Sequence, residues 1–278
     1  MDGAAEGHGV SLGVSLGVIP IQDVLATGSG TLVGFVLGLI GGGGSILAVP
    51  LLVYVVGVSS PHVAIGTSSI AVAVSALANL VGHAKAGRVK WPCGLVFAVA
   101  GAAGAALGST FGKQFDGERL LVLFGVLMIV IAGLMVWKGS RGADIDVRLT
   151  RASAPKLVPL LMGYGVGVGA LAGFFGIGGG FLVVPGIVAA TGMPLIFAIG
   201  SSLVSVFAFG LTTAANYALS GFIDWTLVAF FIGGGVIGGI GGQMLAGKLA
   251  ERKRALSNIF AAIVALVGAY VVWRGLSA

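Results

Sequence analysis

Ionised side chains are scarce in this chain of 278 residues, since Asp, Glu, Lys and Arg together make up only 9% of it. A soluble domain carries about 25% charged residues. Hydrophobic residues make up 57% of this sequence, and its mean hydropathy is +1.11. Apolar stretches long enough to cross a hydrocarbon layer recur along the whole chain. This composition excludes a soluble protein and predicts an all-α, polytopic membrane protein whose surroundings are a lipid bilayer.

The residue types that build chemical sites are also few. A single cysteine, Cys93, excludes an internal disulfide, and the three histidines have no metal-ligand spacing. Paired carboxylates inside the apolar stretches and a Ser/His/Asp set are both missing, so we expect no metal, no cofactor and no enzyme. The net charge of +6 lies in short loops, which indicates membrane topology rather than a nucleic-acid partner.

One Gly-rich motif is present twice. The sequence GGGGSILAVP fills positions 41–50, and GIGGGFLVVP fills positions 176–185. The separation of the two closing prolines, Pro50 and Pro185, is one position longer than that of two later tryptophans, Trp91 and Trp225. This spacing predicts an internal duplication, with repeat 1 at 24–137 and repeat 2 at 157–273. The separation of Trp91 from Trp225 is called the repeat offset below.

Each repeat contains five apolar pieces in the same order. They are predicted at 24–40, 45–57, 62–84, 91–111 and 118–137, and again at 157–176, 180–192, 194–220, 225–247 and 255–273. The second piece of each repeat follows the glycine run, carries a proline and is too short for a full crossing. We therefore expect a Gly-broken pair of short helices followed by three transmembrane helices in each repeat. The pair is either a re-entrant hairpin or two short crossings.

The loop charges predict how the chain is oriented. Lys and Arg gather at 84–90, 138–156 and 248–254, which places these loops in the cytoplasm. Loop 221–224 has only an acidic residue, so it is expected outside although it corresponds to 84–90. The two repeats are then inverted, with 138–156 as a cytoplasmic linker and both termini, including the tail 1–23, in the periplasm. The alternative is a parallel duplication.

The interior offers no charge to a substrate, because the ionised residues fall in loops or at span ends. An anion can still bind at a helix N-terminus, where backbone N–H groups are unpaired and the helix dipole is positive. The candidate positions are the two runs that lead into the short helices, Gly43, Gly44 and Ser45, and Gly178, Gly179 and Gly180. The alternative for such glycines is close packing between helices.

Polar residues near these runs complete the candidate substrate site. Those at the start of the third piece of each repeat are Gly66, Thr67 and Ser68, and Gly200, Ser201 and Ser202. Their hydroxyls either donate to an oxyanion or bond to carbonyls of their own helix. Asn79 and Asn216 lie deeper and either contact substrate or join helices. His83 and Lys85 either form a funnel that admits the anion from the cytoplasm or simply mark topology.

The combination of GIGGGF with Val184-Pro185, Gly192-x-Pro194, Gly200-Ser201-Ser202 and Asp224-Trp225 resembles the TauE/SafE sulfite exporter family. The resemblance covers about residues 20–273. It implies a secondary transporter of small sulfur-containing anions such as sulfite, thiosulfate, sulfoacetate or other organosulfonates, in a bacterial inner membrane, as a monomer or homodimer. Two alternatives remain, an anion channel and a non-transporting membrane assembly factor. Lys90 and Ser45 depart from the pattern of the second half.

Overall fold

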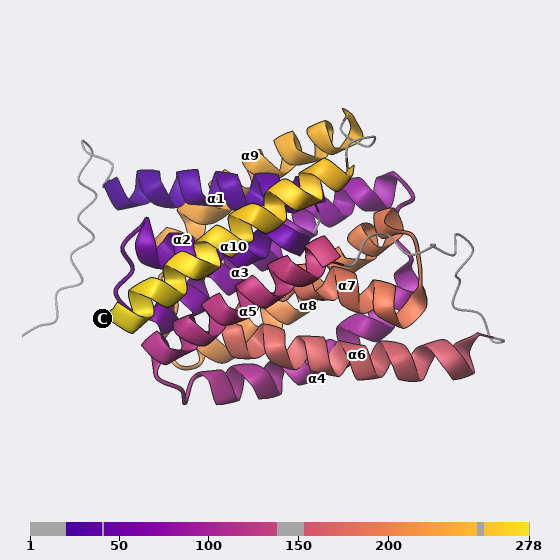
Figure 1. The fold of residues 1–278 in the computed structure, drawn as a ribbon, viewed down its shortest axis with the longest axis horizontal. Helices are drawn as coiled ribbons and strands as arrows, with labels where there is room; N and C mark the ends of the chain where they lie inside the picture. The colour runs from indigo at the N-terminus through magenta and orange to yellow at the C-terminus, as the bar shows by residue number, and fades with distance from the viewer. Residues whose placement is uncertain (1–20, 41, 138–152, 249–252, 278) are drawn as a thin grey trace, which may run out of the picture.

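The computed structural model describes residues 21–40, 42–137, 153–248 and 253–277, and every regular element within them is helical (Figure 1). In chain order they are α1 (Ile21–Ile40), the 3-10 helix η1 (Gly42–Leu47), α2 (Ala48–Tyr54), α3 (Pro61–Lys85), α4 (Trp91–Gly112), α5 (Gly117–Trp137), α6 (Ala154–Phe175), α7 (Gly180–Thr191), α8 (Leu195–Ala218), α9 (Trp225–Lys248) and α10 (Lys253–Ser277). The prediction of an all-α fold is confirmed. The predicted tail up to residue 20 and linker residues 138–152 lie outside the described residues.

Seven helices in the described part of the chain are long and apolar enough to cross a membrane, and they include α1 and α6. The shorter apolar helices include Gly44–Tyr54 and Gly180–Thr191. The opening pair of each half is therefore one full-length helix and one short helix, rather than two short ones. The reason is that the first helices begin earlier than predicted, at Ile21 and Ala154.

Glycines set the lateral packing of the bundle. The helix α1 packs along α9, and α6 packs along α4. A Cβ added to Gly34 would overlap the backbone of Gly235, and one added to Gly169 would overlap the backbone of Gly101. Small residues let helix backbones approach this closely. For these glycines the close-packing interpretation is correct.

The helices α3 and α8 are the most buried of the candidate spans and pack against each other. They run antiparallel, because Gly66 near the start of α3 lies by Tyr217 near the end of α8, while Gly210 lies by Ser69 and Ala73. In Figure 1 the beginning of α1 and the end of α10 lie at the same end of the bundle. The short helices contact this central pair, α2 on α3 and α7 on α8.

Candidate functional site

The two short helical segments approach each other inside the bundle, where α7 is in contact with η1. Their glycine runs have different conformations. Gly42–Leu47 forms the 3-10 helix itself, and α2 follows without a break. In the second run Gly176, Gly178 and Gly179 have φ values of +65°, +62° and +71°, which form an irregular loop between α6 and α7. These are left-handed values that favour glycine.

This glycine loop leads into the N-terminal end of α7, where the first backbone amides of the helix lie. The first helical bonds run from the amides of Leu182 and Val183 to the carbonyl of Gly179, at 2.9 Å each. The preceding amides of Gly180 and Phe181 belong to the first turn, whose N–H groups have no acceptor within the helix. Gly178 lies beside Val72 of α3 and Gly210 of α8. The start of α7 therefore lies beside the central helix pair.

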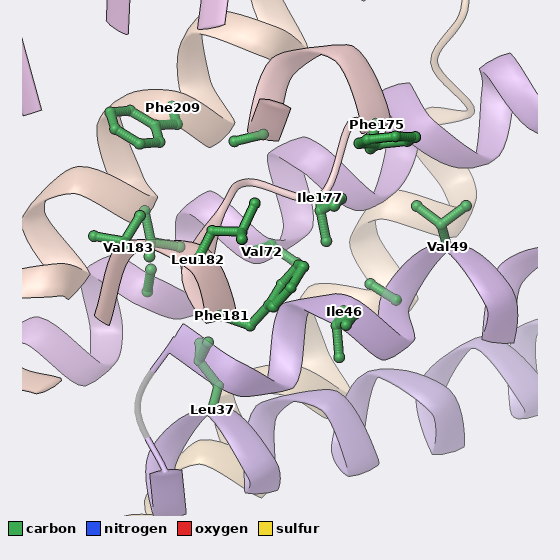
Figure 2. Packing of buried hydrophobic residues seen from close by; sticks show 14 of the residues in the cluster. Leu37, Ile46, Val49, Val72, Phe175, Ile177, Phe181, Leu182, Val183 and Phe209 are labelled. Carbon is green, nitrogen blue, oxygen red and sulfur yellow. The ribbon is translucent and has the colours of Figure 1, made fainter. Parts of the chain in front are cut away.

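Apolar side chains surround the meeting point of the two short segments (Figure 2). The ring of Phe181, at the start of α7, lies near Ile177 and Ile46 of η1. Ile46, Ile177 and Phe181 are 0%, 1% and 5% exposed. The walls next to the amide end of α7 therefore exclude water.

Of the residues predicted as a site in the first glycine run, Gly44 and Ser45 are buried within the protein. Gly44 is buried against α1, because an added Cβ would meet the backbone of Val33 and Leu37. Ser45 is fully buried in η1. Gly43 belongs to the same 3-10 turn. In this half, α1 covers the turn at Gly44.

The hydroxyls of Thr67 and Ser201 hold loops of the opposite half. Thr67 Oγ1 accepts a hydrogen bond from the amide of Asp224 at 3.0 Å, and Ser201 Oγ accepts one from the amide of Lys90 at 2.8 Å. The repeat offset relates Thr67 to Ser201, and it also relates Lys90 to Asp224. The two hydrogen bonds thus occupy corresponding positions in the two halves.

The neighbouring glycines repeat this exchange. An added Cβ at Gly66 would overlap the carbonyl oxygen of Phe222, and one at Gly200 would overlap that of Arg88. Loop 219–224 therefore rests on the start of α3, and loop 86–90 rests on the start of α8. Because α3 and α8 are antiparallel, these two corresponding loops lie at opposite ends of the central pair.

The next two hydroxyls bond within their own helices. Ser68 Oγ donates to the carbonyl of Ile65 at 3.1 Å, and Ser202 Oγ donates to that of Ile199 at 2.7 Å. Such bonds are expected when a serine side chain turns back to a carbonyl of the preceding turn. A substrate oxygen would have to displace these carbonyls in order to receive the same protons.

The two asparagines join helices. Asn79 Oδ1 accepts from Gln243 Nε2 of α9 at 2.6 Å, and Asn216 Nδ2 donates to Ser109 Oγ of α4 at 2.6 Å. Lys113 Nζ also donates to Asn216 Oδ1, at 2.7 Å. These bonds use both amide oxygens and the Nδ2 of Asn216 as interhelical links.

His83 and Lys85 are brought together in the last turn of α3. His83 is 6% exposed, whereas Lys85 is exposed. Of these two residues, only Lys85 is therefore accessible to a solute at this end of the helix.

The sequence analysis did not identify Thr213 and Tyr217 of α8, whose hydroxyls are buried, as candidate site residues. Both side chains are 0% exposed, and neither hydroxyl oxygen has a hydrogen-bond partner among the described residues. The available signal was the repeat offset, because it places Thr213 at the position that corresponds to Asn79.

Ionised groups contribute little to this interior. In the part of the chain whose side chains are described, Asp23 in the first turn of α1 is the only buried residue among Asp, Glu, Lys and Arg. Groups of three or more His, Cys, Asp or Glu that could hold a metal are also absent from the described residues. Among the described side chains, the start of α7 therefore has no buried Asp, Glu, Lys or Arg beside it.

The fold is that of a multi-pass helical membrane protein with a glycine-broken interior. The sequence profile of the family "Sulfite exporter TauE/SafE" matches residues 26–271, so the chain belongs to this family. A probable membrane transporter protein of Xylella fastidiosa strain Temecula1 is 50% identical over 259 residues, covering 91% of this chain and 97% of the relative. The probable membrane transporter protein YunE of Bacillus subtilis is 28% identical over 264 residues, covering 89% and 96%. No solved structure matches the chain. The protein is a membrane transporter of this family, and these names indicate a transporter rather than an enzyme.

Proposed function

We propose that this protein is a secondary transporter that moves small sulfur-containing oxyanions across a bacterial inner membrane by alternating access. Sulfite, thiosulfate, sulfoacetate and other organosulfonates are the candidate substrates. The family supports this class of substrate. The single observation that carries the proposal is the buried amide end of α7, which is built on left-handed glycines and surrounded by apolar side chains.

An oxyanion suits this position for electrostatic reasons. The helix dipole places partial positive charge at the amide end, and unpaired N–H groups donate to anionic oxygens. A cation would be repelled there, and no buried carboxylate among the described side chains of α3, α7 and α8 would compensate it. The apolar surroundings strengthen each bond to the anion, because the local dielectric constant is low. Gly178, Gly179 and Gly180 remain the central candidates, with Gly43, Gly44 and Ser45 as the corresponding positions.

Alternating access is supported by the exchanged contacts between the halves. We propose that residues 24–137 and 157–273 are inverted repeats, joined by a cytoplasmic linker at 138–156 and with both termini in the periplasm. The matching bonds Thr67–Asp224 and Ser201–Lys90 support a pseudo-twofold relation. In such a protein, each half can take the packing of the other, and the access to a central site then changes side.

Thermal stabilisation of the purified protein tests the substrate class. A ligand that binds only the folded state raises its melting temperature. We expect stabilisation by at least one anion among sulfite, thiosulfate, sulfoacetate and methanesulfonate, and none by dimethyl sulfone, a neutral control for methanesulfonate. Equal stabilisation by the sulfone and the sulfonate, or no effect of any anion, would contradict the proposal. The same assay counts against a non-transporting assembly factor if an anion binds.

A further inference from the structure

We propose that the hydroxyl of Thr213 is a substrate ligand, and that with the amide end of α7 it forms an oxyanion site in the second half of the protein only. This inference rests on the proposed function and assigns one specific donor to the anion. Three features support it, namely the unpaired hydroxyl itself, the face of α8 on which Thr213 lies and the corresponding position in the first half.

The hydroxyl of Thr213 differs from those of other helical threonines in this protein. Five threonines, namely Thr27, Thr31, Thr110, Thr191 and Thr212, donate to the carbonyl four residues earlier, at 2.7–2.8 Å. Thr213 Oγ1 has no partner among the described residues, and its side chain is 0% exposed. Buried polar groups are nearly always hydrogen-bonded, so an unpaired one indicates a missing partner such as a ligand.

Thr213 lies on the same face of α8 as the residues that contact the glycine loop before α7. Phe209 and Gly210 of α8 lie against this loop, Phe209 at Gly179 and Gly210 at Gly178. With 3.6 residues per turn, Thr213 is rotated by roughly 40° from Phe209 and roughly 60° from Gly210, between the two. Helical side chains also lean toward the N-terminus of their helix, that is, toward residues 209 and 210. Thr213 therefore lies on the face of α8 that contacts the loop preceding the amide end of α7.

The residue at the corresponding position in the first half already has hydrogen-bond partners within the protein. The repeat offset relates Thr213 to Asn79. The Oδ1 of Asn79 accepts from Gln243 Nε2 at 2.6 Å, and its Nδ2 donates to the carbonyl of Ser75 at 2.8 Å. Gly44, at the start of the first short segment, is covered by α1. At the position of Asn79 the first half therefore has a side chain whose polar atoms are bonded within the protein, whereas the second half has the unpaired hydroxyl of Thr213.

The chemistry of the site follows from these donors. The amides of Gly180 and Phe181 can bond one oxygen of the anion, and the Thr213 hydroxyl can donate to another. Hydrogen bonds to an ionised acceptor are the stronger kind. Val72 and Phe209, which lie beside the loop, are apolar and offer the substrate no charge. The ligand is thus a compact anion with at least two oxygens, as in sulfite, thiosulfate and the sulfonate group.

Three variants test this assignment in the thermal-stabilisation assay with sulfite, thiosulfate and methanesulfonate. Thr213→Val removes the hydroxyl and preserves the shape. We expect the ligand-free protein to melt at an unchanged or higher temperature, because an unpaired buried hydroxyl is lost, while anion binding weakens by about tenfold or more, equivalent to about 1.4 kcal/mol. Thr213→Ser restores the hydroxyl and should restore binding. Thr212→Val is the matched control, since its hydroxyl donates to the carbonyl of Ala208, and it should bind as the wild type does.

The outcomes separate the two proposals. If the wild type binds an anion and Thr213→Val binds it equally tightly, the role of Thr213 is wrong and the proposed function stands. If the wild type binds none of the anions, both fail. If Thr213→Val does not fold, Thr213→Ser decides, because a ligand role requires it to bind within a fewfold of the wild type. Loss of binding in Thr212→Val as well would assign the effect to the helix rather than to the hydroxyl.

Discussion

Ser201 accepts a hydrogen bond at 2.8 Å from the backbone amide of Lys90, and this bond fixes the loop before α4 on the start of α8. The first half contains the corresponding bond from Asp224 to Thr67. Each half therefore holds a loop of the other. Under the proposed alternating access, we expect one of these contacts to break while the other is kept.

We expect Ser201→Ala and Thr67→Val to lower stability by similar amounts. Each substitution leaves one backbone amide without its acceptor, which costs about 1–3 kcal/mol when the amide is buried. The bonds lie at opposite ends of the central helix pair, so the double variant should show an additive loss. Unfolding midpoints of the purified variants in detergent would measure this. A neutral effect of either substitution would show that its bond does not hold the loop.

The glycine interface between α4 and α6 allows a comparison of two neighbouring positions. A Cβ at Gly169 would overlap the backbone of Gly101, whereas a Cβ at Gly167 has no atom within 4 Å. Gly169→Ala should destabilise the protein by about 1–3 kcal/mol because the helices must separate. Gly167→Ala should be neutral or stabilise it by up to about 1 kcal/mol, since alanine favours a helix. Equal melting temperatures for the two variants would contradict this packing.

Gly179→Val is predicted to abolish transport in a protein that still inserts into the membrane. Gly179 has φ +71°, and an added Cβ would meet Ala172 and Phe209. Gly192 at the other end of α7 has φ +73° with no atom within 4 Å of an added Cβ. Gly192→Val is thus a control for backbone strain alone. Uptake assays at matched membrane expression should separate the two, and normal transport by Gly179→Val would exclude the loop from the site.

The inverted orientation predicts opposite labelling of two corresponding positions. Ala86 and Ser220 lie in exposed loops and are related by the repeat offset. In a Cys93→Ala background, Ala86→Cys should react with a membrane-impermeant thiol reagent only from the cytoplasm, and Ser220→Cys only from the periplasm. Labelling of both from the same side would establish a parallel duplication instead.

The short second helices were predictable from sequence, because glycine and proline leave a clear pattern at positions 41–50 and 176–185. The sequence did not predict which helix packs against each glycine-rich helix, because small residues indicate close packing but do not identify the neighbouring helix. For example, α1 of the first half packs on α9 of the second half, and the sequence alone does not indicate this pairing. Helix boundaries also differed from their predicted positions; α1, for example, begins at Ile21 rather than at residue 24.

Of the candidate site, the sequence predicted only the glycine run that contributes backbone groups. The glycines at 178–180 lie at the start of α7 as expected, since left-handed φ values at Gly178 and Gly179 favour glycine. The hydroxyls were harder, because a sequence does not tell which serine or threonine bonds to its own helix. Ser202 does so, and Thr213 does not. Only the hydrogen-bond partners seen in three dimensions distinguish these residues.

Counterflow in proteoliposomes tests the central claim most directly. Vesicles loaded with unlabelled thiosulfate or sulfite, and containing the purified protein, are diluted into a trace of the same anion labelled with sulfur-35. We predict transient, saturable accumulation of label above its equilibrium level in loaded vesicles and none in empty ones, because a carrier exchanges one bound anion for another. Uptake that is linear in concentration and unaffected by the internal anion would indicate a channel and contradict alternating access. Absence of protein-dependent uptake for every sulfur oxyanion would contradict the substrate class.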